Sequence, residues 1–325
     1  MKSSTLTIKS IVATLSLVAF VIGFSATNDS VAQAETMTVQ TIQTNQTTPE
    51  AQVIQWPTIE AKSAFIYDPV GNVVIFEKNA DTQRSMASLL KLMTAATVER
   101  ILTQSPKLAE KQISILNTNN EAPADFALPA KSTWRPDPLV QIMLIGSSNK
   151  AAESLASGII PRSSFMSLMN FNAKQMGLTQ TYFRNPTGLT ELGNIKATST
   201  AGRLDVAAGV STAREVAKLM WTIIAEHPGL LDITNKDSLT IPKANTSETT
   251  VVLNTNKTLN DFPIRFSKTG FTENSGGNLA VVLQKSETSH PYIIVVMGST
   301  QEKRFEDVAK LASTTLALTD VGFDK

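Results

Sequence analysis

Apolar segments typical of β-strands occur at both ends of the ordered part of this chain, and helical patterns fill the middle. Near the start, residues 64–68 and 73–76 predict two strands joined by a turn in the sequence PVGN at 69–72. Three further strands are predicted near the end, at 264–268, 278–284 and 292–298. Strands far apart in sequence can pair in one sheet, whose apolar face is then buried against helices. We therefore expect one α+β domain whose N-terminal hairpin and C-terminal strands complete a single antiparallel sheet.

Between these strands, apolar residues recur at helical spacing. Gly177 is expected to end one of these helices, and Ser211 or Thr212 is expected to cap the start of another, with Glu215 in its first turn. No internal repeat is found in the sequence. The predicted helices are 87–102, 139–156, 165–176, 211–225 and, after the last strand, 302–316.

Charge and cysteine content exclude several classes of protein. The 325 residues include 29 Lys and Arg against 28 Asp and Glu, without a long basic run, so nucleic-acid binding is not expected. The absence of cysteine excludes disulfides, thiolate nucleophiles and cysteine metal sites. The two histidines, His227 and His290, each precede a proline and are expected in loops. We therefore predict no metal site and no cofactor.

The N-terminus predicts export. Lys2 and Lys9 precede an apolar run over residues 11–26, and the sequence Ala-Gln-Ala at 32–34 offers a signal-peptidase site. The run is shorter than the roughly 20 apolar residues of a comfortable membrane span. We interpret residues 1–34 as a cleaved signal peptide or a retained signal anchor. In either case the bulk of the chain is expected outside the cytoplasm, with the anchor as a possible membrane tether.

Residues 35–58 are rich in Thr and Gln and poor in large apolar side chains, which predicts a flexible linker. An ordered catalytic domain is expected to follow over residues 59–325. The linker is equally consistent with a spacer from the membrane and with a processed tail of no functional importance.

Ser88 and Lys91 form the first motif that could carry chemistry. In a helix the two positions share a face, so the hydroxyl and the amine can be hydrogen-bonded. A helix N-terminus and neighbouring positive charge would favour a developing oxyanion and depress the pKa of the lysine, which makes a neutral amine available as a base. Alone the motif is weak, because the pattern S-x-x-K recurs in this chain from Ser147 to Lys150.

Two further short motifs give the first one its weight. Ser147 and Asn149 form an S-x-N triplet, which by itself is most simply a loop or a helix cap. Lys268, Thr269 and Gly270 follow an apolar strand, where a cation and a hydroxyl could hold a carboxylate and the glycine could let a substrate backbone approach. Alone, this triplet is most simply an ordinary strand end.

The three motifs occur in the order S-x-x-K, S-x-N, K-T-G, which is the motif set of penicillin-binding proteins and β-lactamases. The chain from about 64 to 316 resembles the catalytic domain of low-molecular-mass D-alanyl-D-alanine carboxypeptidases. The resemblance is carried by EKNA at 77–80, ASLLKLMTA at 87–95, FRNPTGL at 183–189, STAREVA at 211–217 and KTGFT at 268–272. It implies a β-lactamase/penicillin-binding-protein-like fold: an antiparallel sheet flanked by helices, plus a mainly helical subdomain.

The resemblance also implies roles for the motif residues. Ser88 would be the acyl-ester nucleophile and Lys91 its proton acceptor. Ser147 would relay a proton between Lys91, the leaving amine and Lys268, and Asn149 would hold an amide of the acyl part of the substrate.

The remaining roles concern substrate binding. Lys268 and Thr269 would bind the terminal carboxylate of D-alanine or of a penicillin, and Gly270 would leave room for the substrate backbone. The backbone N–H groups of Ser88 and Phe271 would form the oxyanion hole. Peptidoglycan stem peptides are therefore the expected substrates, and β-lactam antibiotics the expected covalent inhibitors.

The sequence departs from the family pattern at several places. Leu90 replaces the usual Thr, and Lys150 stands where an acidic residue commonly follows the asparagine. The segment 123–138 lacks the expected glycines, so this edge of the site is expected to be built differently. The segment 188–209 is longer than usual and is expected to form a loop beside the site.

The sequence leaves alternatives to a D-Ala-D-Ala carboxypeptidase. A D,D-endopeptidase acting on cross-links would use the same acylation chemistry. A β-lactamase shares the motifs, but no glutamate here matches its deacylating base, since the ELGN sequence at 191–194 does not fit the required spacing. A catalytically silent cell-wall-binding protein on the same fold is disfavoured, because the nucleophile, the base and the carboxylate clamp are all present.

Overall fold

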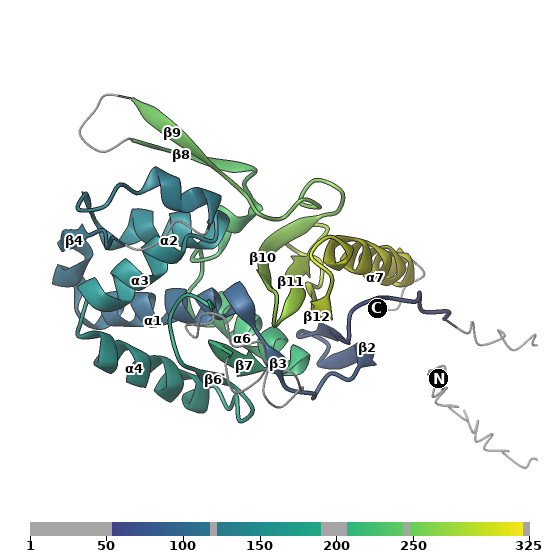
Figure 1. Cartoon of the computed structure of the whole chain (residues 1–325). Helices are drawn as coiled ribbons and strands as arrows, with labels where there is room; N and C mark the ends of the chain where they lie inside the picture. The colour runs from purple at the N-terminus through teal and green to yellow at the C-terminus, as the bar shows by residue number, and fades with distance from the viewer. Residues whose placement is uncertain (1–53, 118–121, 190–206, 243–247, 321–325) are drawn as a thin grey trace, which may run out of the picture. The chain divides into compact units, whose positions relative to one another are not determined.

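A five-stranded antiparallel sheet joins the two ends of the ordered chain (Figure 1). The computed structural model describes residues 54–117, 122–189, 207–242 and 248–320, and the elements below belong to the unit Pro57–Lys325. The sheet order is β10-β11-β12-β1-β2, which confirms the predicted single antiparallel sheet. Its strands are β1 (Ser63–Asp68), β2 (Val73–Lys78), β10 (Ile264–Thr272), β11 (Gly276–Leu283) and β12 (Tyr292–Ser299).

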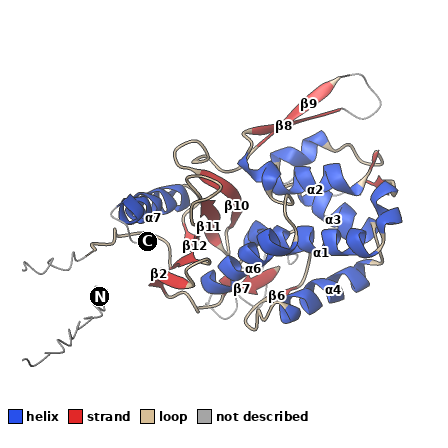
Figure 2. Cartoon of the chain, turned by 180° about the vertical axis from the view of Figure 1, so that it is seen from behind, coloured by secondary structure: helices blue, strands red, loops and turns tan. Residues whose placement is uncertain are grey.

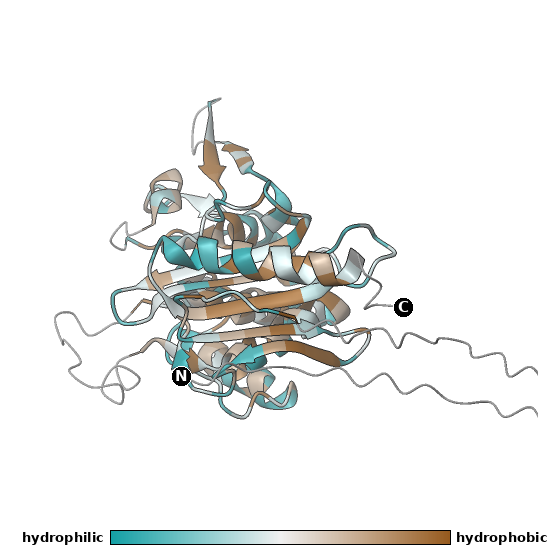
Figure 3. Ribbon diagram, turned by 90° about the vertical axis from the view of Figure 1, so that its right-hand side faces the viewer, coloured by the Kyte–Doolittle hydropathy of each residue, from teal (hydrophilic) through white to brown (hydrophobic). Residues whose placement is uncertain are grey.

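The central strand β12 is buried at all eight positions, because helices pack against it on both faces. The last helix, α7 (Lys303–Asp320), lies across one face of the sheet, as Figure 3 shows. Helix α6 (Ala213–Glu226) packs on β1 and β12. Strand β12 therefore reads as a continuous apolar run and not as an alternating one.

The second part of the domain is mainly helical, as the family resemblance implied (Figure 2). Its centre is α1, which is buried at nine positions and contacts every other long helix of this part. The helices here are α1 (Lys91–Gln104), α2 (Pro136–Ile145), α3 (Asn149–Gly158) and α4 (Arg162–Gln175).

Short elements complete the domain. The two-residue strands are β3 (Arg84–Ser85), β4 (Ile113–Ser114), β5 (Thr133–Trp134) and β6 (Tyr182–Phe183), and β7 (Gly209–Ser211) pairs with β3 and β6. The 3-10 helices are η1 (Ala87–Leu90), η2 (Pro106–Glu110), η3 (Pro123–Ala127) and η4 (Asp232–Asn235).

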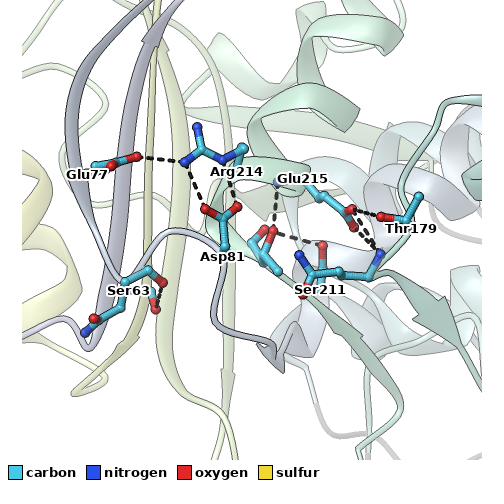
Figure 4. Close-up of polar contacts among 10 residues, drawn as sticks. Ser63, Glu77, Asp81, Thr179, Ser211, Arg214 and Glu215 are labelled. Carbon is cyan, nitrogen blue, oxygen red and sulfur yellow. Dashed lines mark hydrogen bonds and ion pairs between the residues drawn. The ribbon is translucent and has the colours of Figure 1, made fainter.

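Several predicted boundaries are confirmed. Helix α4 is stopped by Gly177, whose φ of 65° is readily adopted only by glycine. Helix α6 is capped by Thr212, whose side chain accepts a hydrogen bond from the Glu215 N–H. Glu215 also fixes the segment before β6, because its carboxylate accepts hydrogen bonds from Gln180 N–H and the Thr181 hydroxyl. Figure 4 shows this carboxylate next to Thr179 of the same segment.

Three predicted elements are wrong in detail. The helix expected at 139–156 is two helices, because Gly146 ends α2 and the Ser148 side chain caps α3. The helix expected from 87 begins with the 3-10 turn η1 before α1 starts. Strand β10 runs to Thr272, so the K-T-G triplet lies inside the strand and not at its end.

A hairpin of β8 (Ser238–Pro242) and β9 (Thr249–Leu253) was not predicted and projects beside the helical part (Figure 1). The predictions for residues 1–34 and most of the linker, and for the greater part of the segment 188–209, lie outside the described residues. Within the described ranges, no helix is both long enough and apolar enough to cross a membrane.

Candidate active site

Ser88 and Lys91 meet where η1 passes into α1. Lys91 Nζ lies 2.7 Å from Ser88 Oγ, as the i, i+3 spacing predicted. Ala87 has a φ of 45°, which is unfavourable for a residue with a side chain and marks a tightly specified turn at the nucleophile. The pair therefore has the geometry that proton transfer from the hydroxyl to the amine requires.

The Lys91 side chain is fully buried, and its nitrogen has two further acceptors. Nζ lies 2.8 Å from Asn149 Oδ1 and 2.5 Å from the Thr187 carbonyl oxygen. A neutral amine has two N–H bonds and one lone pair. With both N–H bonds directed to these fixed acceptors, the lone pair is left to face the Ser88 hydroxyl.

The Thr187 carbonyl is held in place by the turn around Asn185. The buried Asn185 Oδ1 accepts hydrogen bonds from Thr187 N–H and Gly188 N–H, and its Nδ2 donates to Leu189 O. A Cβ on Gly188 would lie 2.4 Å from the Ala87 carbonyl oxygen, so only glycine lets this turn approach η1. The FRNPTGL stretch carried the family resemblance, but sequence reasoning gave it no role.

Burial lowers the pKa of Lys91 from 10.5 to about 7, and the negative charge of Asp125 partly opposes that shift. Near neutral pH a large fraction of this lysine is therefore the neutral amine. A lysine exposed to water would be almost entirely protonated under the same conditions.

Ser147 and Asn149 belong to the short connection between α2 and α3. Ser147 has a φ of 58°, and its Oγ accepts a hydrogen bond from Lys268 Nζ at 2.9 Å. Asn149 opens α3 and directs its carboxamide oxygen to Lys91. The break in the predicted helix thus places the two polar side chains of the S-x-N motif beside both lysines.

Lys268 is buried in β10, and its pKa is well below the usual value. The causes are desolvation first, then repulsion from Lys91 and from Arg304. Arg304, on α7, donates to the Gly270 carbonyl oxygen at 2.8 Å, and burial lowers the pKa of its guanidinium to about 10. Three basic side chains therefore lie close together in this region, and an anionic ligand bound there would favour their protonated forms.

Strand β10 is an edge of the sheet, and its backbone next to Ser88 is partly unpaired. Ser267 N–H donates to Thr234 Oγ1 in η4 and not to a neighbouring strand, so alternate residues 269 and 271 present their N–H groups on the same open side. A Cβ on Gly270 would lie 3.1 Å from Ser88 N. The geometry thus brings the Phe271 N–H and the Ser88 backbone to one region.

Thr269 lies in the same strand and is joined to a residue that sequence reasoning missed. Thr269 Oγ1 and Thr255 Oγ1 are 2.6 Å apart, and Thr255 N–H donates to Ile145 O at the end of α2. The hydroxyl of Thr269 is thereby oriented by a second hydroxyl from the segment after β9.

Asn278 is another residue without a sequence signal. Its Nδ2 donates to the carbonyl oxygens of Ser85 and Met86, and its Oδ1 accepts from Gly298 N–H. Because Met86 directly precedes η1, this buried amide ties the nucleophile turn to the sheet. Such a connection joins residues almost two hundred positions apart and has no local pattern.

The arrangement offers a hydroxyl nucleophile, an amine of low pKa and a cationic edge strand. Within the described ranges, no group of three or more His, Cys, Asp and Glu side chains could hold a metal ion. The predicted site residues converge around η1, the start of α3 and the edge strand β10. These residues are Ser88, Lys91, Ser147, Asn149, Lys268, Thr269, Gly270 and Phe271.

Comparison with known proteins gives concordant results. The family model described as D-alanyl-D-alanine carboxypeptidase matches residues 29–301. The D-alanyl-D-alanine endopeptidase of Escherichia coli K12 is 30% identical over 271 residues, which cover 81% of this chain and 80% of that protein. D-alanyl-D-alanine carboxypeptidase DacC of the same strain is 28% identical over 272 residues, covering 80% of this chain and 62% of that protein.

The fold is similar to that of a solved penicillin-binding protein. Penicillin-Binding Protein D2 from Listeria monocytogenes, in its ampicillin-bound form, superposes with a TM-score of 0.68 at 26% identity. The superposition covers 80% of this chain and 98% of that one. A cefotaxime-bound form of the same protein gives a TM-score of 0.67.

Proposed function

This chain belongs to the D-alanyl-D-alanine carboxypeptidase family, and we propose that it is a serine D,D-peptidase with Ser88 as its nucleophile. The observation that carries the proposal is the 2.7 Å contact between Ser88 Oγ and the buried Lys91 Nζ. The lowered pKa of that lysine supports its role as the base at neutral pH.

In the proposed acylation, the Lys91 lone pair takes the Ser88 hydroxyl proton as Oγ bonds to the carbonyl carbon between two D-alanine residues. The oxyanion of the tetrahedral intermediate accepts hydrogen bonds from the N–H groups of Ser88 and Phe271. As the C–N bond breaks, the protonated Lys91 gives up its proton and the leaving amine gains one. We assign the relay between them to the Ser147 hydroxyl, which lies 2.9 Å from Lys268 Nζ. An acyl ester on Ser88 and a free amine result.

Hydrolysis reverses these roles with water as the nucleophile. Lys91 takes a proton from the water molecule, the oxygen bonds to the ester carbonyl carbon, and the proton returns to Ser88 Oγ when the ester bond breaks. The products are the shortened peptide and the original enzyme. Asn149 holds the amine in place through both steps by accepting one of its N–H bonds.

The cationic edge strand supports recognition of a terminal carboxylate. Lys268 and Thr269 are proposed to bind the carboxylate of the last D-alanine, with the substrate backbone alongside β10 and close to Gly270. The carboxylate of a penicillin would occupy the same place. Ampicillin and cefotaxime bind the Listeria relative, and we propose β-lactams as covalent inhibitors here as well.

We propose D-Ala-D-Ala carboxypeptidase as the main activity, releasing the terminal D-alanine of peptidoglycan stem peptides. D,D-endopeptidase is the second candidate, because one relative at 30% identity is an endopeptidase. Incubation with purified pentapeptide and with cross-linked dimers, followed by mass analysis, separates them. Release of D-alanine alone supports the first, and cleavage of the dimer supports the second.

The proposed substrate lies outside the cytoplasmic membrane, and the proposed organisation agrees with that location. Residues 1–34 are proposed to direct export as a signal peptide or an anchor, and residues 35–58 to link them to the catalytic domain at 59–325. Protease accessibility of the catalytic domain in intact spheroplasts tests this placement.

Fluorescent penicillin tests the enzyme proposal directly. Wild type should become covalently labelled, and Ser88→Ala should not. A wild type that stays unlabelled, under conditions that label a known relative, contradicts the proposed function and favours a silent binding protein. Label that persists in Ser88→Ala contradicts the choice of nucleophile, and rapid turnover of a chromogenic cephalosporin would indicate a β-lactamase.

A further inference from the structure

We propose that Asp125 is a positioning residue, which holds the S-x-N connection in its active geometry and supplies a counter-charge to the buried Lys91. This inference rests on the proposed function. Asp125 lies in η3, within the segment 123–138 that departs from the family pattern. Its side chain is completely buried.

One oxygen of this carboxylate binds the residues on either side of Asn149. Asp125 Oδ1 accepts hydrogen bonds from Ser148 Oγ at 2.6 Å and from Lys150 N–H at 3.0 Å. The other oxygen, Oδ2, accepts from Ala122 N–H at 3.0 Å. Asp125 therefore joins η3 to the start of α3 through two bonds, one on each side of Asn149.

The bond to Ser148 continues into the helix. Ser148 Oγ donates to Asp125 and accepts from Ala151 N–H at 3.0 Å, which makes it the N-cap of α3. Ser147, immediately before it, has a φ of 58°. Such a backbone conformation persists only where surrounding bonds specify it. Fixing residues 148 and 150 thereby fixes both Ser147 and Asn149.

Several basic side chains are buried in the same part of the domain as Asp125. Lys150, which follows Asn149, is also buried and donates to Leu128 O near η3. In this chain the residue after Asn149 is a base, and the acid comes from η3. The buried carboxylate beside the S-x-N connection therefore comes from η3 and not from the residue that follows Asn149.

The charged groups around Lys91 determine the pH at which this lysine loses its proton. Lys268 from β10 repels Lys91, and Arg304 from α7 adds positive charge at Lys268. Asp125 from η3 attracts Lys91 and raises its pKa against the larger effect of burial. Ser88, Asn149 and Thr187 contribute neutral hydrogen-bonding groups.

The test is the pH profile of acylation by fluorescent penicillin, measured as the second-order rate constant with full-length protein. Asp125→Asn keeps the shape of the side chain and removes its charge, so Lys91 loses a proton more easily. The acid limb of the profile is expected to move to lower pH. A purely structural role would lower the rate without moving that limb.

Two further variants separate position from charge. Ser148→Ala removes the hydroxyl bridge and leaves the carboxylate, so the rate should fall about tenfold or more while the limb stays at the wild-type pH. Asp125→Glu keeps the charge but displaces it by one methylene and should behave in the same way. If Asp125→Asn does not fold, these two variants still decide whether the bridge positions the site.

Glu215→Gln is the matched control. Glu215 is a buried carboxylate that also fixes a loop through a backbone N–H and hydroxyls, but its bonds go to Thr179, which Figure 4 labels, and to Gln180 and Thr181. It should leave the limb in place. A wild-type limb in folded Asp125→Asn would overturn the counter-charge role, and wild-type rates in Ser148→Ala and Asp125→Glu would overturn the positioning role. An unlabelled wild type would instead overturn the proposed function.

Discussion

Lys268 Nζ lies 2.9 Å from Ser147 Oγ, although 121 residues separate them in the sequence. The bond joins the edge strand of the sheet to the connection between α2 and α3. Ser147 adjoins the residue capping α3, and Lys268 adjoins the hydroxyl that Thr255 orients. The distance between the proposed relay hydroxyl and the proposed carboxylate clamp therefore depends directly on how the two parts of the domain are placed.

The pKa of Lys91 predicts how acylation depends on pH. Because this pKa is about 7 and only the neutral amine accepts a proton, the rate of penicillin acylation should reach a plateau above neutrality. Below pH 7 it should fall about tenfold per unit of pH, as the neutral fraction falls. Stopped-flow or quenched labelling between pH 5 and 9 measures the profile. A limb centred near pH 10 would contradict Lys91 as the base.

Gly270→Ala should block the site without unfolding the domain. A Cβ at this position would lie 2.9 Å from Met86 O and 3.1 Å from Ser88 N, both of them backbone atoms that cannot move aside easily. We expect the acylation rate to fall about 100-fold, the size of effect that follows from losing one oxyanion donor. Circular dichroism and thermal melting check the fold. Wild-type acylation would show that Ser88 N–H is not used.

Asn185→Asp should move the pH profile in the opposite direction to Asp125→Asn. Its oxygen can still accept from Thr187 N–H and Gly188 N–H, so the turn that directs a carbonyl to Lys91 is largely kept. The added negative charge favours the protonated lysine and should shift the acid limb to higher pH. Loss of the donor to Leu189 O should cost about 1–3 kcal/mol of unfolding free energy.

The outcome for Asn185→Asp is read from the same labelling assay, with denaturant unfolding as the second measurement. A stable variant whose acid limb coincides with that of wild type would show that a charge in the Thr187 turn does not change the pKa of Lys91. Asp125→Asn removes a negative charge near Lys91 and Asn185→Asp adds one. The two variants should therefore shift the acid limb in opposite directions.

The motifs predicted the catalytic residues of the site better than the helices and strands that support them. Residues 87–95 and 268–272 are contiguous, so their sequence reveals them, and the S-x-N triplet becomes meaningful beside them. The break at Gly146 was not predicted, because apolar residues continue at helical spacing on both sides of it. Helix α2 ends at Gly146, and α3 starts at an N-cap made by Ser148 and supported by Asp125, which lies over twenty residues earlier.

The extent of β10 was missed for a related reason. The apolar pattern stops after Phe266, but the strand continues through polar residues that are buried because they form the site. Asn278 in β11 contacts the nucleophile turn, and Arg304 in α7 contacts Gly270. A single buried amide or guanidinium has no periodicity, so only the three-dimensional structure reveals such supports.

Arg304→Met should weaken recognition of a carboxylate more than it alters the chemistry. The guanidinium is largely buried, its positive charge acts on Lys268, and it donates to the Gly270 carbonyl oxygen at 2.8 Å. Its loss removes one positive charge that attracts an anionic ligand. It should also raise the pKa of Lys268, which favours the protonated lysine and offsets part of that loss. We expect acylation by benzylpenicillin to fall about tenfold or more, mainly through weaker binding.

Lys257→Met serves as the control for Arg304→Met, because it removes the same charge from a nearby side chain. Lys257 and Arg304 both lie over the Phe305 ring. Lys257, however, is exposed and paired with Glu302, so solvent screens its charge. It should acylate as wild type does. A penicillin methyl ester, which has no carboxylate, should lose much less than tenfold in Arg304→Met. Equal losses for the acid and the ester would show that Arg304 supports the strand alone and does not contribute to anion binding.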